Sequence, residues 1–124
     1  MNQALDPKAL CRMAVKSLDK HKAVDIRVIR VSELTSIADY FIIAEGTSST
    51  QVRSLSDYVE TELAEQGVTP SHTEGYRGLS WVLLDYGCVV VHVFQKEARD
   101  YYNLEHLWKD GTPVPLEEFI EVTD

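Results

Sequence analysis

At 124 residues, 44% of them hydrophobic and 26% charged, the chain has the size of one domain and a composition unlike that of disordered proteins. Its formal net charge of −8 disfavours direct nucleic-acid binding as the main activity and favours a basic partner, because phosphate backbones repel an acidic protein. No metal site, membrane span or secretory signal is expected, since the cysteines and histidines lack ligand spacing and no apolar run approaches ~20 residues. These features predict a cytoplasmic protein without cofactors.

The first third of the chain predicts a helix followed by two strands. Asp6 and Pro7 suit the N-cap and first position of a helix over residues 7–22, whose apolar residues recur at helical spacing. Residues 25–31 alternate only roughly between apolar and polar, and indicate a strand. The apolar run at 40–44 predicts a second, buried strand.

A second amphipathic helix is predicted from Ser48 to about Gln66. Ser48 and Gln51 have the spacing of a capping box, in which the side chain of each residue satisfies a backbone N–H of the other. Gly67 then ends the helix, because glycine readily takes the left-handed conformation found after helix ends.

The turn before this helix, from Gly46 to Ser49, leaves a second function open. A turn between a strand and a helix can present backbone N–H groups to a phosphate, so a nucleotide-binding or nucleotidyltransferase-like enzyme is an alternative. Such an enzyme needs paired carboxylates to hold metal ions, whereas only Asp57 follows, without an acidic neighbour two residues away. Helix capping is the favoured interpretation of the turn.

The most apolar part of the chain predicts a hairpin of strands 81–86 and 88–95. Gly87 supplies the left-handed residue that a short hairpin loop needs. In the second strand residues 89, 91 and 93 point one way and 90, 92 and 94 the other, and both sets are largely apolar, so we expect a central strand.

Trp81, Leu83 and Asp85 share one face of the first hairpin strand. An aromatic ring beside a carboxylate suggests an edge or rim where another protein could dock, but the pattern alone favours a Trp81 that only covers the border of the core. His92 on the second strand is a candidate general base, but such a histidine is more often a hydrogen-bonded core residue, which is the interpretation we adopt.

The remaining segments complete the predicted order α-β-β-α-β-β-β-α. Residues 69–74 suit an edge strand because they include a proline, and 103–109 suit a short helix. The acidic tail, 111–124, is expected to pack weakly or fray, since only Leu116, Phe119 and Ile120 could anchor it. We therefore predict an α/β (α+β) protein with a mixed five-stranded sheet and flanking helices, in a single domain over 1–110.

Several motifs, in this order and over about residues 7 to 109, resemble those of the Iojap family, the ribosomal silencing factors. They are 38–43 (ADYFII), 46–49 (GTSS), 74–75 (EG), 81–87 (WVLLDYG), 90–94 (VVHVF), Arg99 and 102–108 (YNLEHLW). One departure is Cys88, which stands where the family pattern generally has Asp.

The resemblance implies a nucleotidyltransferase-like topology without catalysis. It also implies binding to the large ribosomal subunit through ribosomal protein L-fourteen, which blocks joining of the subunits and represses translation. No catalytic residues are then expected. The acidic chain suits a basic ribosomal protein.

The residues that we expect to bind the partner combine aromatic and aliphatic groups with carboxylates for a Lys or Arg. They are Trp81, Leu83, Asp85, Tyr86 and Glu74. A further alternative is a homodimeric structural or scaffold protein that uses Tyr101, Tyr102 and Trp108, and a homodimer is also compatible with the silencing function.

Overall fold

The computed structural model describes residues 6–121. This part of the chain contains four α-helices, six strands and one 3-10 helix, joined by loops and turns. In chain order they are α1 (Pro7–Lys20), β1 (Val24–Arg30), β2 (Tyr40–Gly46), α2 (Ser49–Ala64), β3 (His72–Glu74), β4 (Trp81–Asp85), β5 (Val89–Gln95), α3 (Lys96–Tyr102), α4 (Leu104–Leu107), β6 (Thr112–Pro113) and η1 (Leu116–Glu118). All the expected elements are present with bounds shifted by a few residues, while α3, β6 and η1 were not expected.

The strands form one mixed sheet in the order β3-β4-β5-β2-β1-β6. Only β2 and β5 are parallel, and every other neighbouring pair is antiparallel. The predicted count of five strands is therefore wrong, because β6 adds a sixth by pairing with Ile29 and Arg30 of β1. A two-residue strand that contains a proline has no alternation by which the sequence could predict it. The nucleotidyltransferase-like topology stays a prediction.

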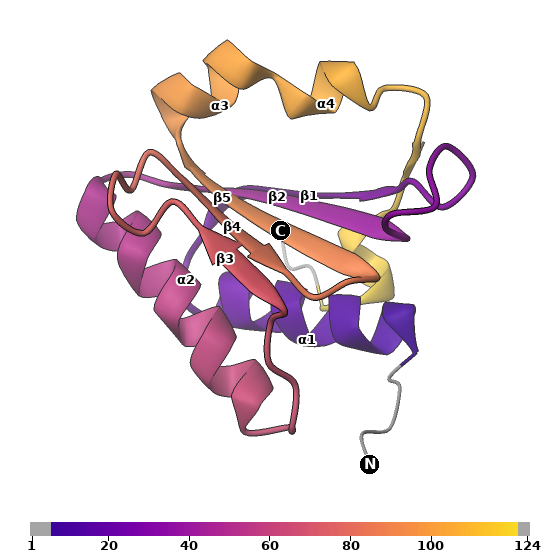
Figure 1. The fold of residues 1–124 in the computed structure, drawn as a ribbon, viewed down its shortest axis with the longest axis horizontal. Helices are drawn as coiled ribbons and strands as arrows, with labels where there is room; N and C mark the ends of the chain where they lie inside the picture. Colours follow the sequence, from indigo (N-terminus) through magenta and orange to yellow (C-terminus); the bar gives the residue numbers. More distant parts are fainter. Residues whose placement is uncertain (1–5, 122–124) are drawn as a thin grey trace.

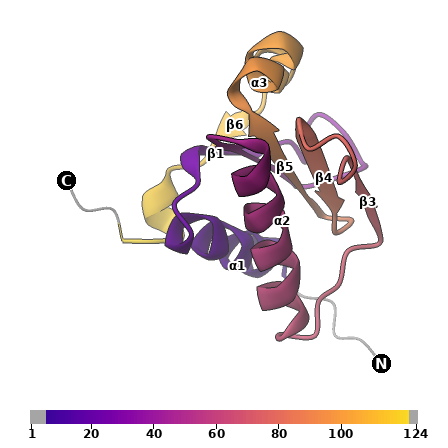
Figure 2. The same cartoon turned by 90° about the vertical axis from the view of Figure 1, so that its left-hand side faces the viewer.

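Helices cover both faces of the sheet, but unequally. In Figure 1 α1 and α2 lie below the sheet, whereas α3 and α4 run along its upper side; Figure 2 shows the same layers from the end. The alternation predicted for β5 is confirmed: its odd-numbered residues enter the core under α1 and α2, and its even-numbered ones face α3 and α4. None of the helices among residues 6–121 is both long and apolar enough to cross a bilayer.

The two long helices begin where the sequence predicts. Asp6 is the N-cap of α1, but its side chain makes no capping hydrogen bond. Ser48 caps α2, and its Oγ accepts a hydrogen bond from the Gln51 backbone N–H at 3.1 Å. The reciprocal half of the capping box differs from the prediction, because the Gln51 Oε1 accepts from the backbone N–H of Thr47 rather than from that of the N-cap residue.

The irregular pattern of β1 has a structural cause. The register of β1 against β2 shifts between Val24 and Arg27, and Asp25 has a left-handed φ of 47° within this shift. Aspartate tolerates that conformation better than most residues. Ile26 and Val28 face α1 and α2 and Ile29 faces the other side, so apolar residues occur on both buried faces of β1.

The tail is anchored as far as residue 120, contrary to the expectation that it packs weakly. The Val114 N–H donates to the Val28 carbonyl at 2.9 Å, which continues the edge pairing of β6. Phe119 then inserts into the core beside α1 and keeps only 4% of its surface exposed. Residues 122–124 lie outside the described part of the chain. The division into a single domain over residues 1–110 and a tail over 111–124 stays a prediction.

Candidate partner-binding site

The predicted partner-binding residues lie on and around β4, which is not an edge strand. β4 lies between β3 and β5, so the edge position suggested for it is wrong; the edge belongs to β3, which has three residues. Trp81, Leu83 and Asp85 do share one face, and each is half-buried. We call this surface, together with Glu74 of β3, the β4 face. Glu74 belongs to it because it is the cross-strand partner of Leu83.

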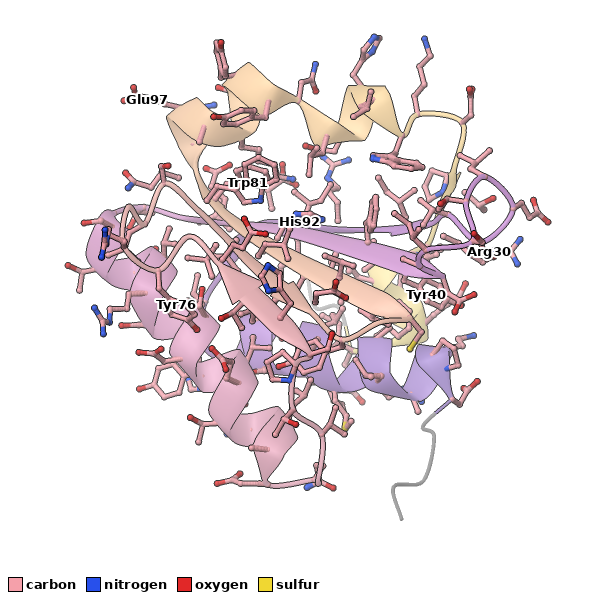
Figure 3. All side chains as sticks on the ribbon, viewed as in Figure 1. Arg30, Tyr40, Tyr76, Trp81, His92 and Glu97 are labelled. Atoms are coloured by element: carbon pink, nitrogen blue, oxygen red, sulfur yellow. The ribbon has the colours of Figure 1, made fainter. Side chains whose placement is uncertain are left out.

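The Trp81 ring makes part of its contacts inside the protein. Figure 3 shows it beneath α3. Its Nε1–H donates to Nδ1 of His92 at 3.1 Å, and its ring lies 4.9 Å from that of Phe94 and 4.8 Å from that of Tyr102. Trp81 therefore covers the border of the core and also contributes to the surface, so both interpretations of this residue apply.

His92 is a core residue, as predicted, and not an exposed general base. It keeps 5% of its surface exposed, and its Nδ1 accepts the Trp81 hydrogen bond. Burial lowers the pKa of His92 to about 4, so the ring is neutral at pH 7. Its Nε2 has no hydrogen-bond partner among the described residues. The ring packs against Phe41 in an edge-to-face arrangement, with centroids 5.2 Å apart.

Asp85 has a structural role in the hairpin in addition to the role expected of it. Its Oδ1 accepts a hydrogen bond from the Gly87 N–H at 2.8 Å. Gly87 has a φ of 86°, the left-handed conformation predicted for the turn. The Asp85 carboxylate is therefore held in place at the end of the β4 face, which is the condition for binding a cation with little loss of side-chain freedom.

Tyr86 is separated from the other four candidates. The alternation of β4 carries it to the opposite face of the sheet, where it packs against the core under α1 and α2. Its hydroxyl is buried without a hydrogen-bond partner among the described residues, and burial raises its pKa well above the usual value. A direct contact of Tyr86 with the partner of Trp81 is thus not favoured by the geometry, and its binding role stays a prediction.

Glu74 is exposed on the edge strand, next to a glycine that the fold requires. Its carboxylate lies 2.6 Å from Nε2 of His72, which shares the same face. Gly75 has a φ of 94°, and a Cβ at this position would lie 1.9 Å from the carbonyl oxygen of Trp81. Glu74 therefore lies opposite Leu83, while the following Gly75 makes a close backbone approach to Trp81 that only glycine allows.

Arg99 is the residue of this region whose role the sequence reasoning missed. Only 5% of its surface is exposed, and its guanidinium contacts Glu105 through two hydrogen bonds of 3.0 and 3.2 Å. Further ion pairs join it to Glu45 at 3.4 Å and to Asp25 at 3.6 Å. Arg99 thus ties α3 and the start of α4 to β2 and β1, which fixes the layer above Trp81. Nothing in a helical pattern distinguishes such an arginine from a solvated one.

Exposed apolar side chains border this layer on α3 and α4. Tyr101 is 81% and Leu107 is 69% exposed, and Tyr102 is half-exposed beside Trp81. Trp108 differs, because its ring packs edge-to-face on Phe41 at 4.9 Å and is partly buried. A homodimer through Tyr101, Tyr102 and Trp108 stays a prediction, with the first two as its accessible members.

The turn from Gly46 to Ser49 lies at the carboxyl ends of the parallel strands β2 and β5, beside a hollow of about 280 Å³. Two acidic side chains and Lys96 line the hollow. The Thr47 N–H and Ser48 Oγ are both engaged with Gln51, as capping requires. No cluster of three metal-ligating side chains occurs in residues 6–121. The nucleotide alternative stays a prediction, testable by a thermal shift with nucleotides.

Comparison with known proteins identifies the family. Residues 4–124 match the family described as "Ribosomal silencing factor during starvation". The chain is 41% identical over 111 residues to ribosomal silencing factor RsfS of Halalkalibacterium halodurans, covering 90% of this chain and 95% of that one. It is 35% identical over 101 residues to the chloroplastic protein Iojap of Zea mays, covering 82% of this chain and 44% of that one.

A crystal structure of a protein from Chromobacterium violaceum has the same fold. The two chains superpose with a TM-score of 0.83 at 37% sequence identity, over 90% of this chain and 91% of that one. At such identity the likeness extends beyond topology to the sequence itself. This chain belongs to the Iojap family of ribosomal silencing factors.

Proposed function

We propose that this protein binds the large ribosomal subunit through ribosomal protein L-fourteen, blocks joining of the small subunit and thereby represses translation. Membership of the silencing-factor family supports a ribosomal role. The observation that carries the proposed binding mode is the β4 face, where Trp81 and Leu83 are only half-buried although β4 is flanked by a strand on each side. The helical layer above the sheet does not fully cover this part of it (Figure 1).

The chemistry of the β4 face suits a basic protein surface. Leu83 and the exposed part of Trp81 offer apolar area for the centre of an interface, and the Asp85 and Glu74 carboxylates lie at its border. Carboxylates at such positions bind Lys or Arg side chains with charge-assisted hydrogen bonds. Because Trp81 is held by His92, its ring needs little further ordering when the partner docks.

Blocking by occupancy has a quantitative signature. A protein that covers the joining surface acts by mass action, so its effect saturates when every large subunit is filled. It is also weaker on ribosomes that are already joined, because the binding surface is then covered. An enzyme would instead act in trace amounts, given time.

Two measurements test the proposal. Co-sedimentation with isolated subunits is expected to retain the protein on large subunits and not on small ones. Light scattering of separated subunits is expected to show fewer joined ribosomes as the protein is added, with an end point near one protein per large subunit. Absence of binding to large subunits, a substoichiometric end point, or normal joining at full occupancy contradicts the proposal.

A further inference from the structure

Helix α1 carries an unusual share of the positive charge of this acidic protein. Four of the twelve Lys and Arg residues of the chain lie within its 14 residues, whereas Asp19 is its single acidic residue. The four cations are spaced four apart, so each lies about one turn after the previous one. They are Lys8, Arg12, Lys16 and Lys20, which we call the α1 stripe.

The α1 stripe winds across the outer surface of the helix between its two neighbours. A spacing of four residues advances about 40° around a helix with 3.6 residues per turn, so the row is oblique to the axis. At one end Lys8 lies 2.9 Å from Glu118 of η1, and at the other Lys20 lies 3.6 Å from Glu62 of α2. Both lysines are exposed, although Glu62 is half-buried and also contacts His21, and ion pairs of exposed lysines are weak enough for another anion to compete.

The centre of the stripe is the part most open to a new anion. Arg12 donates only to the backbone carbonyl of Glu118, at 3.4 Å, and Lys16 is exposed. Neither forms an ion pair with a carboxylate among residues 6–121. A surface hollow of about 310 Å³ adjoins Lys16 and Lys20 between α1 and α2.

We propose that the α1 stripe binds the phosphate backbone of structured RNA. A row of cations on a rigid helix fits a polyanion, whereas an isolated carboxylate would need only one of them. Since the family acts on ribosomes, RNA is the polyanion that such a protein meets. α1 and the β4 face lie in different layers (Figure 2), so occupation of one does not obstruct the other.

A membrane surface is a poorer occupant for this helix. Helices that lie on membranes insert apolar side chains beside their cations. In α1 the apolar residues face the protein core instead, and the five at its centre are buried. They are Leu10, Cys11, Ala14, Val15 and Leu18.

The test uses fluorescence anisotropy of the full-length protein with a labelled RNA duplex of about 20 base pairs, from low to physiological salt. In the double variant Arg12→Gln/Lys16→Gln we expect affinity at low salt to fall about tenfold. Its salt dependence should weaken by up to about 2 in the log–log slope, since each lost phosphate contact removes close to one unit. The matched control, Lys96→Gln/Lys109→Gln, removes the same charge from another layer and should bind like the unchanged protein.

Three results would overturn the proposal: no duplex binding at low salt, equal losses in the two double variants, or tighter binding to phosphatidylserine vesicles or polyglutamate than to the duplex. Both pairs of substitutions are at positions outside the core, so melting temperatures within a few degrees of the unchanged protein are expected and checked first. The readout requires no ribosome, so failure of the proposed subunit binding and failure of RNA binding are told apart.

Discussion

The two faces of the sheet are stabilised in different ways. The face under α1 and α2 is covered by long amphipathic helices and by the tail, and its residues are almost entirely aliphatic. The face under α3 and α4 relies on aromatic rings, one buried histidine and the ion pairs of Arg99. The first face contributes stability through the burial of aliphatic side chains. The second leaves Trp81 and Leu83 within reach of a partner.

Adjacent leucines of β4 offer the largest expected contrast between the faces. Leu84 is fully buried under α1 and α2, whereas Leu83 is half-buried on the β4 face. Leu84→Ala should lower the free energy of unfolding by about 3 kcal/mol or more, because a buried cavity cannot collapse fully. Leu83→Ala should cost about 1 kcal/mol or less. Urea denaturation followed by circular dichroism measures both, and equal losses would contradict the difference between the faces.

Acid should destabilise the protein through His92. Its pKa is about 4 in the folded protein and about 6.5 in the unfolded chain, so the unfolded chain binds the extra proton between these values. The contribution of neutral His92 to the free energy of unfolding is therefore fully present above pH 6.5. It is lost as the pH drops toward 4, which lowers the free energy of unfolding by about 3 kcal/mol.

The control for this pH dependence is His92→Gln, which keeps an acceptor for the Trp81 N–H without a titrating ring. Its free energy of unfolding, measured at several pH values, should vary much less between pH 6.5 and 4.5. If the variant and the unchanged protein lose stability in parallel, groups other than His92 cause the loss.

Trp81→Ala should weaken binding to large subunits by about 2 kcal/mol, or roughly 30-fold, as expected for a central aromatic residue. Because the ring also packs on Phe94 and Tyr102, some loss of stability is expected too. Binding is therefore compared by co-sedimentation at a temperature where circular dichroism shows the variant folded. Full binding by the folded variant would exclude Trp81 from the interface.

The smallest expected effect concerns the rate of association. If the Glu74 carboxylate attracts a basic partner, Glu74→Gln should slow association slightly and weaken its decline with rising salt. Glu65→Gln, an exposed charge at the end of α2, is the matched control and should leave the rate unchanged. Stopped-flow mixing with large subunits measures both, and an association rate of the unchanged protein that is flat from low to physiological salt would rule out guidance by charge.

The sequence predicts those parts of the fold in which apolar residues recur at regular spacing. Both long helices and the hairpin follow from regular apolar spacing and from Ser48 and Gly87. The separation of Tyr86 from the other candidate residues could also be predicted from the sequence. Tyr86 is one residue beyond Asp85, and neighbouring residues of a strand point to opposite faces. Tyr86 therefore lies on the face opposite Trp81, and its binding role stays a prediction.

Other parts of the fold depend on contacts between distant segments, which no local pattern reveals. Phe119 follows two prolines and a run without periodicity, yet it completes the core beside α1. β6 exists only because β1 offers it a partner. Arg99 looks like any helical arginine until Glu45, far away in the chain, is brought to it by β2.

The parallel pairing of β2 with β5 has a consequence for how the protein forms. These strands are the centre of the sheet, yet α2, β3 and β4 all lie between them in the chain. Closing so long a connection costs chain entropy before the contacts between β2 and β5 are gained, so we expect the domain to fold more slowly than a helical bundle of its size. During synthesis the central pair cannot assemble until Gln95 has left the exit tunnel. A nascent chain that stops earlier exposes the paired edge of β2 and needs protection from aggregation.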